Sequence, residues 1–449
     1  MSRPSPTTRT GAGQRNALFV VLICFVTIIF DGYDLVVYGT TVPSILAFEE
    51  WGVTPAEAGA IGSYALIGML IGTLVVGAIT DIFGRRKIML ISITWFSVAM
   101  GLTALAPNAE VFGLLRFVAG LGLGGVVPTA IALTVEYSPK GRRQLNNALM
   151  YSGYSVGGIL AALVALALLP ETDFRVMYAI GLLPLVTVVP IAWKFLPESI
   201  AFLSAKGRHA EARALADRYG VVLDDVTVTP APVDAATDRL AGIRTLFTRQ
   251  YVIATLLFAA ASFCGLLLVY GLNTWLPQIM REAGYQLGSS LAFLLVLNAG
   301  AIIGAIGASR VADRIGSKPV TAAAFLAATV SILLLSINLP TALLFLLVAV
   351  AGLGSVGTQI LVNGYVATHY PDTARATALG WSLGIGRIGA ILGPVLGGLV
   401  VGSSLGYQWN FYLFAVFAVV GAVLIAVVPR RPVTPTPVTG AVGASDSRR

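Results

Sequence analysis

Residues 77–87 read GAITDIFGRRK, a short polar stretch directly after a long apolar run. A related stretch, SRVADRIGSK, fills residues 309–318 and also follows an apolar run. In both stretches an acid precedes a glycine by three positions, and the two acids, Asp81 and Asp313, are 232 positions apart. This spacing predicts that the chain contains two related halves.

A second motif pair has nearly the same offset. Residues 136–139 read EYSP and residues 369–371 read HYP, which places Tyr137 and Tyr370 at an offset of 233. Two motif pairs at one offset predict an internal repeat. In membrane transporters, such parallel repeats are related by an axis along the membrane normal, and the substrate site lies between them near the midplane.

The composition excludes most soluble classes. The chain has 449 residues, of which 57% are hydrophobic and 11% are charged, and its mean hydropathy is +0.85. A soluble domain carries roughly 25% charged residues. We therefore expect no soluble enzyme, nucleic-acid partner or disordered chain. The two cysteines lie in apolar runs and provide neither a disulfide framework nor a metal ligand set.

Twelve apolar runs are long enough to cross a bilayer as helices, which takes about 20 residues each. They predict an all-α integral membrane protein with two pseudo-symmetric six-helix bundles. The runs are 17–45, 57–80, 88–106, 110–136, 145–169, 176–196, 251–276, 288–311, 319–337, 341–368, 375–401 and 408–428.

The polar stretches divide the chain into parts. We expect an N-terminal tail over 1–16, a first bundle over 17–196, a central loop over 197–250, a second bundle over 251–428 and a C-terminal tail over 429–449. Within the loop, 201–219 predicts one short amphipathic helix at the membrane surface, and 220–240 predicts a loose linker.

The basic residues predict the orientation. Of the 29 Lys and Arg residues, 25 fall on the side of the two termini. Only Arg175 and Arg281 fall on the opposite side, while Arg116 and Arg387 lie within spans. The positive-inside rule therefore places both termini in the cytoplasm.

Several motifs resemble the major facilitator superfamily. They are the loop at 77–87, the RFVAGLGLG run at 116–124 and the PES run at 197–199. A narrower set resembles the aromatic acid:proton symporter group of that superfamily. This set comprises DGYD at 31–34, LNTWLP at 272–277 and ALGWSLGIGRIG at 378–389.

The resemblance implies a secondary active transporter in the bacterial cytoplasmic (inner) membrane. It would import benzoate, a hydroxybenzoate or a similar aromatic carboxylate with protons, by alternating access. The proton would be the coupling ion, with no other cofactor, and the lipid bilayer and the small acid would be the partners of a monomer.

Five ionisable residues stay within the spans: Asp31, Asp34, Arg116, Glu136 and Arg387. A charged group at the middle of a bilayer costs roughly 2.5–3.5 kcal/mol or more, so a functional role is the default interpretation. The alternative is a structural pair that holds helices together.

Asp31 and Asp34 lie about one turn apart on one helical face. Two neighbouring carboxylates in a medium of low dielectric repel each other, and desolvation adds to the cost of the charged form. We therefore expect the pair to serve as the proton-coupling site. A purely structural or gating pair is the alternative.

Arg116 and Arg387 are candidate contacts for the substrate anion. A guanidinium stays charged, and its planar fork matches a carboxylate. Arg116 could bind the substrate directly or pair with one of the two aspartates, and protonation of that aspartate would then release it. Arg387 could instead serve helix packing or a gate.

Aromatic and amide side chains within the spans could contact a flat anionic ligand. Most aromatic residues in membrane proteins serve packing or the interfacial belts, and the amides could simply bridge helices. The aromatic candidates are Tyr33, Tyr38, Tyr154, Phe263, Tyr270, Trp275 and Trp381, and the amide candidates are Asn273, Asn298, Gln359 and Asn363.

The loops on the cytoplasmic side are expected to form a gate, in which Asp81 caps or pairs with a helix of the other half. A basic loop that only fixes topology is the alternative. The gating candidates are Gly77, Asp81, Gly84, Arg85, Arg86, Glu136, Arg142, Asp313, Arg314 and Arg375.

Other functions remain as alternatives. A multidrug or other organic-ion proton antiporter is the closest, although span five lacks the Gly-Pro that such proteins usually carry there. Uptake of sugars or dicarboxylates is a further alternative. The chain has no nucleotide-binding motif, nucleophile elbow or large soluble signalling domain, which disfavours an ATP-driven pump, a membrane enzyme and a sensor.

Overall fold

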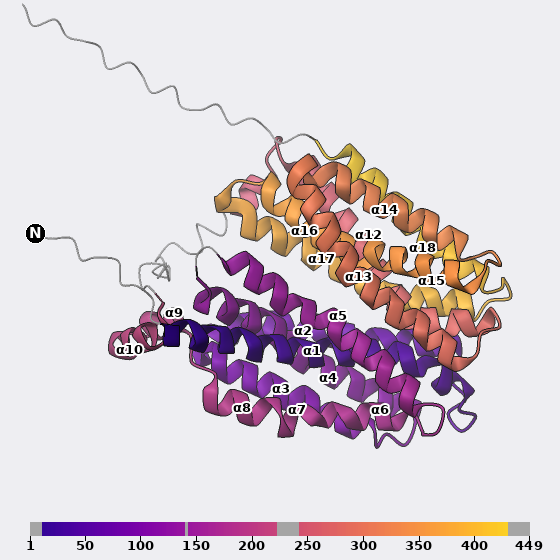
Figure 1. Cartoon of the computed structure of the whole chain (residues 1–449), viewed down its shortest axis with the longest axis horizontal. Helices are drawn as coiled ribbons and strands as arrows, with labels where there is room; N and C mark the ends of the chain where they lie inside the picture. The colour runs from indigo at the N-terminus through magenta and orange to yellow at the C-terminus, as the bar shows by residue number, and fades with distance from the viewer. Residues whose placement is uncertain (1–10, 140–141, 222–241, 430–449) are drawn as a thin grey trace, which may run out of the picture.

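A computed structural model describes residues 11–139, 142–221 and 242–429. The part of the chain that it describes contains helices and no strand. Figure 1 shows the helices of the first half and those of the second half as two bundles lying side by side. The expected all-α architecture of two bundles is therefore confirmed.

The first bundle contains five long helices and one interrupted span. Pro184 and Pro190 fall in the interrupted span, where each lacks the amide N–H that would bond one turn back. The elements are α1 (Gly11–Ala47), α2 (Pro55–Phe83), α3 (Arg85–Thr103), α4 (Ala109–Tyr137), α5 (Arg143–Leu168), α6 (Arg175–Ala179), η2 (Ile180–Leu182), α7 (Leu183–Val186) and α8 (Val188–Phe195).

The second bundle repeats this order, with one span widened into a π-helical turn, η4, at its middle. The elements are α12 (Val252–Glu282), α13 (Leu287–Ile315), α14 (Ser317–Leu334), α15 (Thr341–Gly352), η4 (Leu353–Gly357), α16 (Thr358–His369), α17 (Asp372–Val401) and α18 (Gln408–Val427).

The repeated loop motif has a structural reason. Gly84 joins α2 to α3 with φ +91°, and Gly316 joins α13 to α14 with φ +97°. Glycine adopts this region without steric cost. Each of these glycines donates its N–H at 2.9 Å to a carbonyl four residues earlier, on Thr80 and Ala312 respectively. The offset of 232 therefore marks the same turn in both halves.

Eleven helices in the described ranges are long and apolar enough to cross a membrane. The twelfth span is α3, whose first residues Arg85, Arg86 and Lys87 make it less apolar. Together they give the expected twelve-span fold.

Small residues allow the closest helix pairs. A methyl group added at Gly120 on α4 would collide with the backbone of Ala65 on α2. In the second bundle, a methyl group at Gly352 would collide with the backbone of Leu297 on α13. Such contacts replace the hydrophobic driving force that is absent between helices in lipid.

The central loop differs from the expectation. The single helix predicted over 201–219 is wrong, because two helices, α9 (Ile200–Ala205) and α10 (His209–Tyr219), meet at Gly207 with φ +74°. A short helical turn also spans 242–246. Most of the predicted linker over 220–240, and the tails outside 11–429, lie beyond the described residues.

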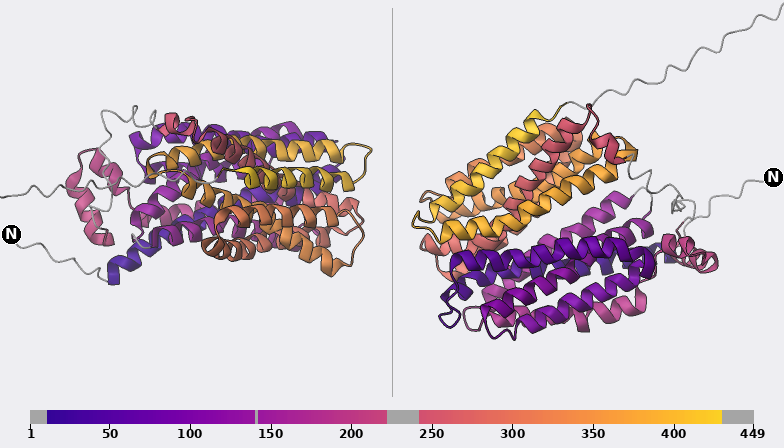
Figure 2. Two further views of the ribbon diagram at one scale, coloured as in Figure 1. Left: turned by 90° about the horizontal axis from the view of Figure 1, so that it is seen from above. Right: turned by 180° about the vertical axis from the view of Figure 1, so that it is seen from behind.

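The bundles touch from their middle to one end only. Figures 1 and 2 show them diverging toward the end that carries α9 and α10. Near the opposite end, Arg281 Nη1 donates to the Pro43 carbonyl at 3.2 Å. Closer to the middle, Ser63 Oγ donates to the Ile391 carbonyl at 2.7 Å. The space between the bundles therefore opens toward α9 and α10.

The contact between the bundles at Gly39 can be tested. A methyl group there would collide with the Asn273 carbonyl on the other bundle, whereas Gly307 on α13 faces open space. We expect Gly39→Ala to lower the free energy of unfolding by about 1–3 kcal/mol, as overpacking does. Gly307→Ala should leave it unchanged or slightly higher. Thermal unfolding in detergent measures both, and equal effects would contradict this packing.

Candidate functional site

Asp34 and Arg116 form an ion pair inside the first bundle. Arg116 Nη1, on α4, donates to Asp34 Oδ1 and also to the Asp34 backbone carbonyl, at 3.2 Å in the second bond. Both side chains are 1% exposed. Of the two aspartates on α1, Asp34 is therefore the one that directly pairs with Arg116.

Aromatic side chains enclose this pair. The Tyr38 ring centroid lies 5.5 Å from the Arg116 guanidinium carbon, and the Tyr38 hydroxyl donates to the Ala58 carbonyl at 2.5 Å. Tyr178, whose hydroxyl is hydrogen-bonded to the Thr41 hydroxyl at 2.7 Å, also lies near the ion pair. Arg116 Nε and Asp34 Oδ2 find no hydrogen-bond partner among the described residues. The pair therefore retains one donor and one acceptor without a hydrogen bond, which costs free energy in a buried site.

Asp31 lies in different surroundings, where the two bundles meet. It is 1% exposed, and its Oδ1 has no hydrogen-bond partner among the described residues. Its electrostatic neighbours are Asp34 and, from α17 of the second bundle, Arg387. Arg387 is partly buried and contacts Met69 Sδ on α2 at 2.9 Å. Asp31 and Arg387 thus link the bundles by charge.

Three tyrosines surround Asp31 and Arg387. Tyr151 and Tyr154 on α5 and Tyr270 on α12 all interact electrostatically with both charges. We call Asp31, Arg387 and these three tyrosines the junction cluster. It combines one acid, one guanidinium and aromatic faces, the groups that a carboxylate on a ring requires.

Solvent reaches the junction cluster. Tyr151 is 40% exposed and interacts electrostatically with both Asp31 and Arg387. On α17, Gly380 and Gly384 precede Arg387 at helical spacing, are exposed and face open space. The exposed face of α17 therefore leads from the open end of the molecule to Arg387.

The amide candidates join helices within the second bundle. Asn298 Nδ2 on α13 donates to Asn273 Oδ1 on α12 at 3.0 Å. Gln359 Nε2 donates to Asn363 Oδ1 at 3.1 Å and approaches Ser262 Oγ at 3.4 Å. The side-chain oxygens of Asn298 and Gln359 have no hydrogen-bond partner among the described residues. These amides bridge helices and retain free acceptors.

Two predicted ring contacts lie away from the junction cluster. Trp275 is fully buried, and its indole N–H donates to the Pro394 carbonyl at 2.7 Å, so it packs α12 against α17. Trp381 is 38% exposed on the outer face of the second bundle, where its ring meets Phe247 edge to face at 5.2 Å. The structure does not bring either tryptophan to the charges.

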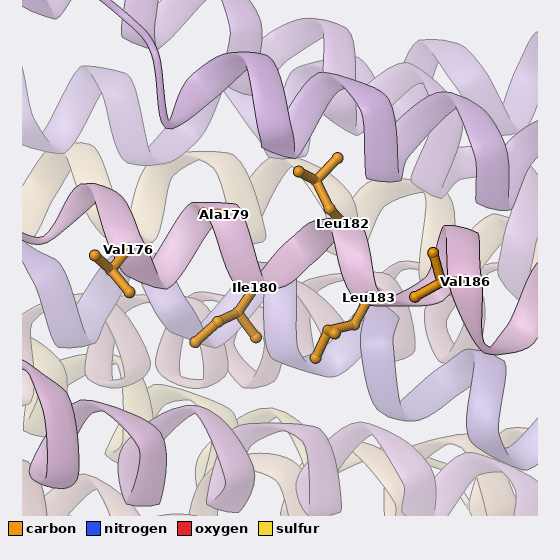
Figure 3. A pocket seen from close by; sticks show the side chains of 6 residues that line it. All are labelled: Val176, Ala179, Ile180, Leu182, Leu183 and Val186. Atoms are coloured by element: carbon orange, nitrogen blue, oxygen red, sulfur yellow. The ribbon is translucent and has the colours of Figure 1, made fainter.

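One apolar hollow on the first bundle has no charged side chain in its lining. Figure 3 shows it on the interrupted span, lined only by aliphatic side chains such as Val176, Ile180 and Leu183. A carboxylate needs hydrogen-bond donors or a positive charge. This hollow is therefore no candidate for the anion site.

The sequence did not point to two residues that lie near Arg387, Tyr151 and Met69. Tyr151 lies three positions before Tyr154, which places both on one helical face, and this spacing could have revealed it. Met69 has no comparable signal, because its contact with Arg387 depends on how the bundles dock.

The gating candidates form a network within the first bundle. Arg85 Nη1 lies 3.0 Å from Glu136 Oε2, and Glu136 also accepts hydrogen bonds from Ser199 Oγ and the Ala201 N–H, at 2.8 and 2.6 Å. The Arg86 N–H donates to Glu198 at 3.0 Å. The PES run at 197–199 is thereby tied to the start of α3 and the end of α4.

The remaining gating candidates lie around this end of the molecule. Gly84 packs against Glu198, and Gly77 faces open space. Asp81, Arg142, Asp313, Arg314 and Arg375 are exposed. Glu136 thus lies in a hydrogen-bonded network, whereas these five charged side chains are exposed, and Arg375 among them interacts with another group.

The buried ion pair predicts an asymmetric double-mutant cycle. Asp34→Asn leaves a guanidinium that cannot lose its proton, and we expect a loss of about 3–5 kcal/mol in unfolding free energy. Arg116→Gln should cost less, because the remaining carboxylate can take a proton. The double variant should recover part of the loss. Thermal unfolding in detergent measures all four proteins, and additive effects would contradict a direct pair.

Comparisons with known proteins agree with this architecture. The chain is 37% identical over 438 residues to the benzoate transport protein of Acinetobacter baylyi, covering 95% of this chain and 93% of that one. It is 40% identical over 424 residues to the gentisate transporter of Corynebacterium glutamicum, covering 93% and 88%.

A solved structure shares the fold. The inward-open xylose transporter XylE from E. coli has a TM-score of 0.73 at 15% identity, over 94% of this chain and 98% of that one. The family model described as Major Facilitator Superfamily matches residues 24–309 and 299–445. The chain therefore belongs to the Major Facilitator Superfamily, and it is a multi-pass membrane transporter.

Proposed function

We propose that this protein imports an aromatic carboxylate, such as benzoate or a hydroxybenzoate, together with protons. The observation that carries the proposal is the charge arrangement on α1, where Asp34 pairs with Arg116 while Asp31 faces Arg387 across the bundle junction. Relatives named for benzoate and gentisate transport support the substrate class.

The substrate carboxylate binds Arg387 in this proposal. Arg387 is partly buried, and Tyr154 and Tyr270 interact with it electrostatically. Arg116 is sealed by Asp34 and Tyr38 and acts in this conformation as a counter-ion. The free oxygens of Asn298 and Gln359 could accept hydrogen bonds from ring hydroxyl groups.

In this proposal, protonation of Asp31 favours binding of the substrate anion to Arg387. An ionised Asp31 attracts Arg387 and repels a carboxylate. A proton on Asp31 removes both effects and leaves the guanidinium available for the substrate. A second proton, on Asp34, would neutralise that carboxylate and so release Arg116 from the ion pair. Coupling therefore follows from electrostatic balance at the junction.

Alternating access follows from the two bundles. The excess of basic residues supports an orientation with both termini in the cytoplasm, so the open end faces the cytoplasm. The Glu136 network keeps the loops of the first bundle in place, and Asp81 contacts the second bundle when this end closes. The proposed transporter acts as a monomer, with tails over 1–16 and 429–449 and bundles over 17–196 and 251–428, joined by the loop over 197–250.

Uptake by the reconstituted protein tests this function. Proteoliposomes with an imposed inward proton gradient should accumulate labelled benzoate, 4-hydroxybenzoate or gentisate. One pH unit should give roughly tenfold accumulation if one proton enters with one monoanion, since it supplies about 1.4 kcal/mol. Membrane voltage should then have no effect. Arg387→Gln serves as the inactive control.

The alternative functions, multidrug export and sugar uptake, predict different transport in the same proteoliposomes. Proton-driven export of a lipophilic cation, with no uptake of any of the three acids, would replace the proposal by a multidrug antiporter. Uptake of a labelled sugar in preference to the acids would also contradict it.

A further inference from the structure

An apolar groove runs along the outer face of the second bundle, where α12, α17 and α18 meet. Its volume is about 500 Å³. No charged side chain lines it, and the residues that define its length and floor are Leu256, Phe263, Cys264, Trp381, Phe417 and Leu424. The groove lies on the side of α17 that carries Trp381, away from the face of Arg387, so the transport site does not use it.

The length of the groove matches one leaflet of a bilayer. Along α12 it extends from Leu256 to Cys264, eight residue steps, which is about 12 Å at the rise of an α-helix. It starts one turn inside Val252, where α12 begins at the open end of the molecule. Half of the hydrocarbon thickness is about 15 Å. The groove is therefore nearly as long as the hydrocarbon layer of one leaflet is thick.

A short segment covers the mouth of the groove. The Phe247 ring meets Trp381 edge to face, and both Ile243 and Phe247, four positions apart, are exposed. The segment is held in place by Leu246, which is fully buried and whose carbonyl accepts a hydrogen bond from Thr255 Oγ1 at 2.9 Å. Exposed apolar side chains at this level are typical of a segment that lies in the membrane interface.

Two arginines flank Phe247 in the sequence, Arg244 three positions before it and Arg249 two positions after it. Arg244 and Arg249 are exposed, and no ion pair joins either of them to another described residue. A guanidinium binds a phosphate through two parallel hydrogen bonds. The aliphatic hollow of Figure 3 differs, since the neighbouring Arg175 is engaged by Asp173 at 2.9 Å and by the Phe48 ring.

We propose that this groove binds an anionic phospholipid of the leaflet at the open end. One acyl chain fills the groove beneath Trp381, and the phosphate accepts hydrogen bonds from Arg244 and Arg249. The apolar lining selects a hydrocarbon chain, and Arg244 and Arg249, which form no ion pair with another described residue, select a negative headgroup.

Native mass spectrometry of the full chain, in detergent with equal amounts of phosphatidylglycerol and phosphatidylcholine, tests the proposal. Each arginine near an anionic surface contributes about 1 kcal/mol, so we expect a preference for phosphatidylglycerol of up to about thirtyfold. Arg244→Gln with Arg249→Gln should bring the ratio close to one. Arg213→Gln with Arg310→Gln removes two exposed charges elsewhere and should preserve it.

A second variant tests the groove itself. Ala260 lines the groove and is partly exposed, so Ala260→Phe fills the space without disturbing the core. It should lose the bound lipid while its thermal unfolding stays close to that of the parent. Three results would overturn the proposal: no preference in the parent, retention of the lipid by Ala260→Phe, or conversion of a dimer to a monomer by Ala260→Phe with lipid binding unchanged.

Discussion

Two carboxylates and two guanidinium groups lie in the interior of this molecule. Because hydrocarbon surrounds the helices, each of these charges requires an opposite charge nearby. Each charge alone would cost several kcal/mol at this depth. Asp34 and Arg116 satisfy the requirement directly as a buried pair. Asp31 and Arg387 interact electrostatically across the bundle junction without forming an ion pair. The second arrangement can change during transport, because its members belong to different bundles.

The architecture places these four groups where they can respond to both solutions. Glycine turns repeat the α2–α3 hairpin as α13–α14, and small residues let the helices within each bundle pack as rigid units. The bundles then meet from the middle to one end. Asp31 interacts with Arg387 of the other bundle, and the neighbouring Tyr151 is exposed. Rocking of one bundle against the other would change the surroundings of Asp31 more than those of Asp34.

The sequence predicted the fold well because hydropathy and glycine turns are local signals. It also assigned Asp31, Asp34 and Arg116 to long helices, and all three side chains are buried there. It could not select Asp34 over Asp31 as the partner of Arg116, since both lie on one face of α1 and the choice depends on how α4 packs. The rotation of an almost wholly apolar helix is equally hard to read, which is why Trp275 and Trp381 were candidates for the ring site. A single glycine, Gly207, was enough to divide the helix expected over 201–219.

The central claim is that Asp31 carries the proton that admits the substrate anion. The most direct measurement compares two assays on Asp31→Asn in proteoliposomes: accumulation under an inward proton gradient, and counterflow exchange without one. Asparagine mimics a permanently protonated acid, so the loaded carrier should still reorient. The account predicts that gradient-driven accumulation is lost while counterflow persists. If Asp31→Asn accumulates substrate as the parent does, Asp31 is not the proton carrier and the account is contradicted.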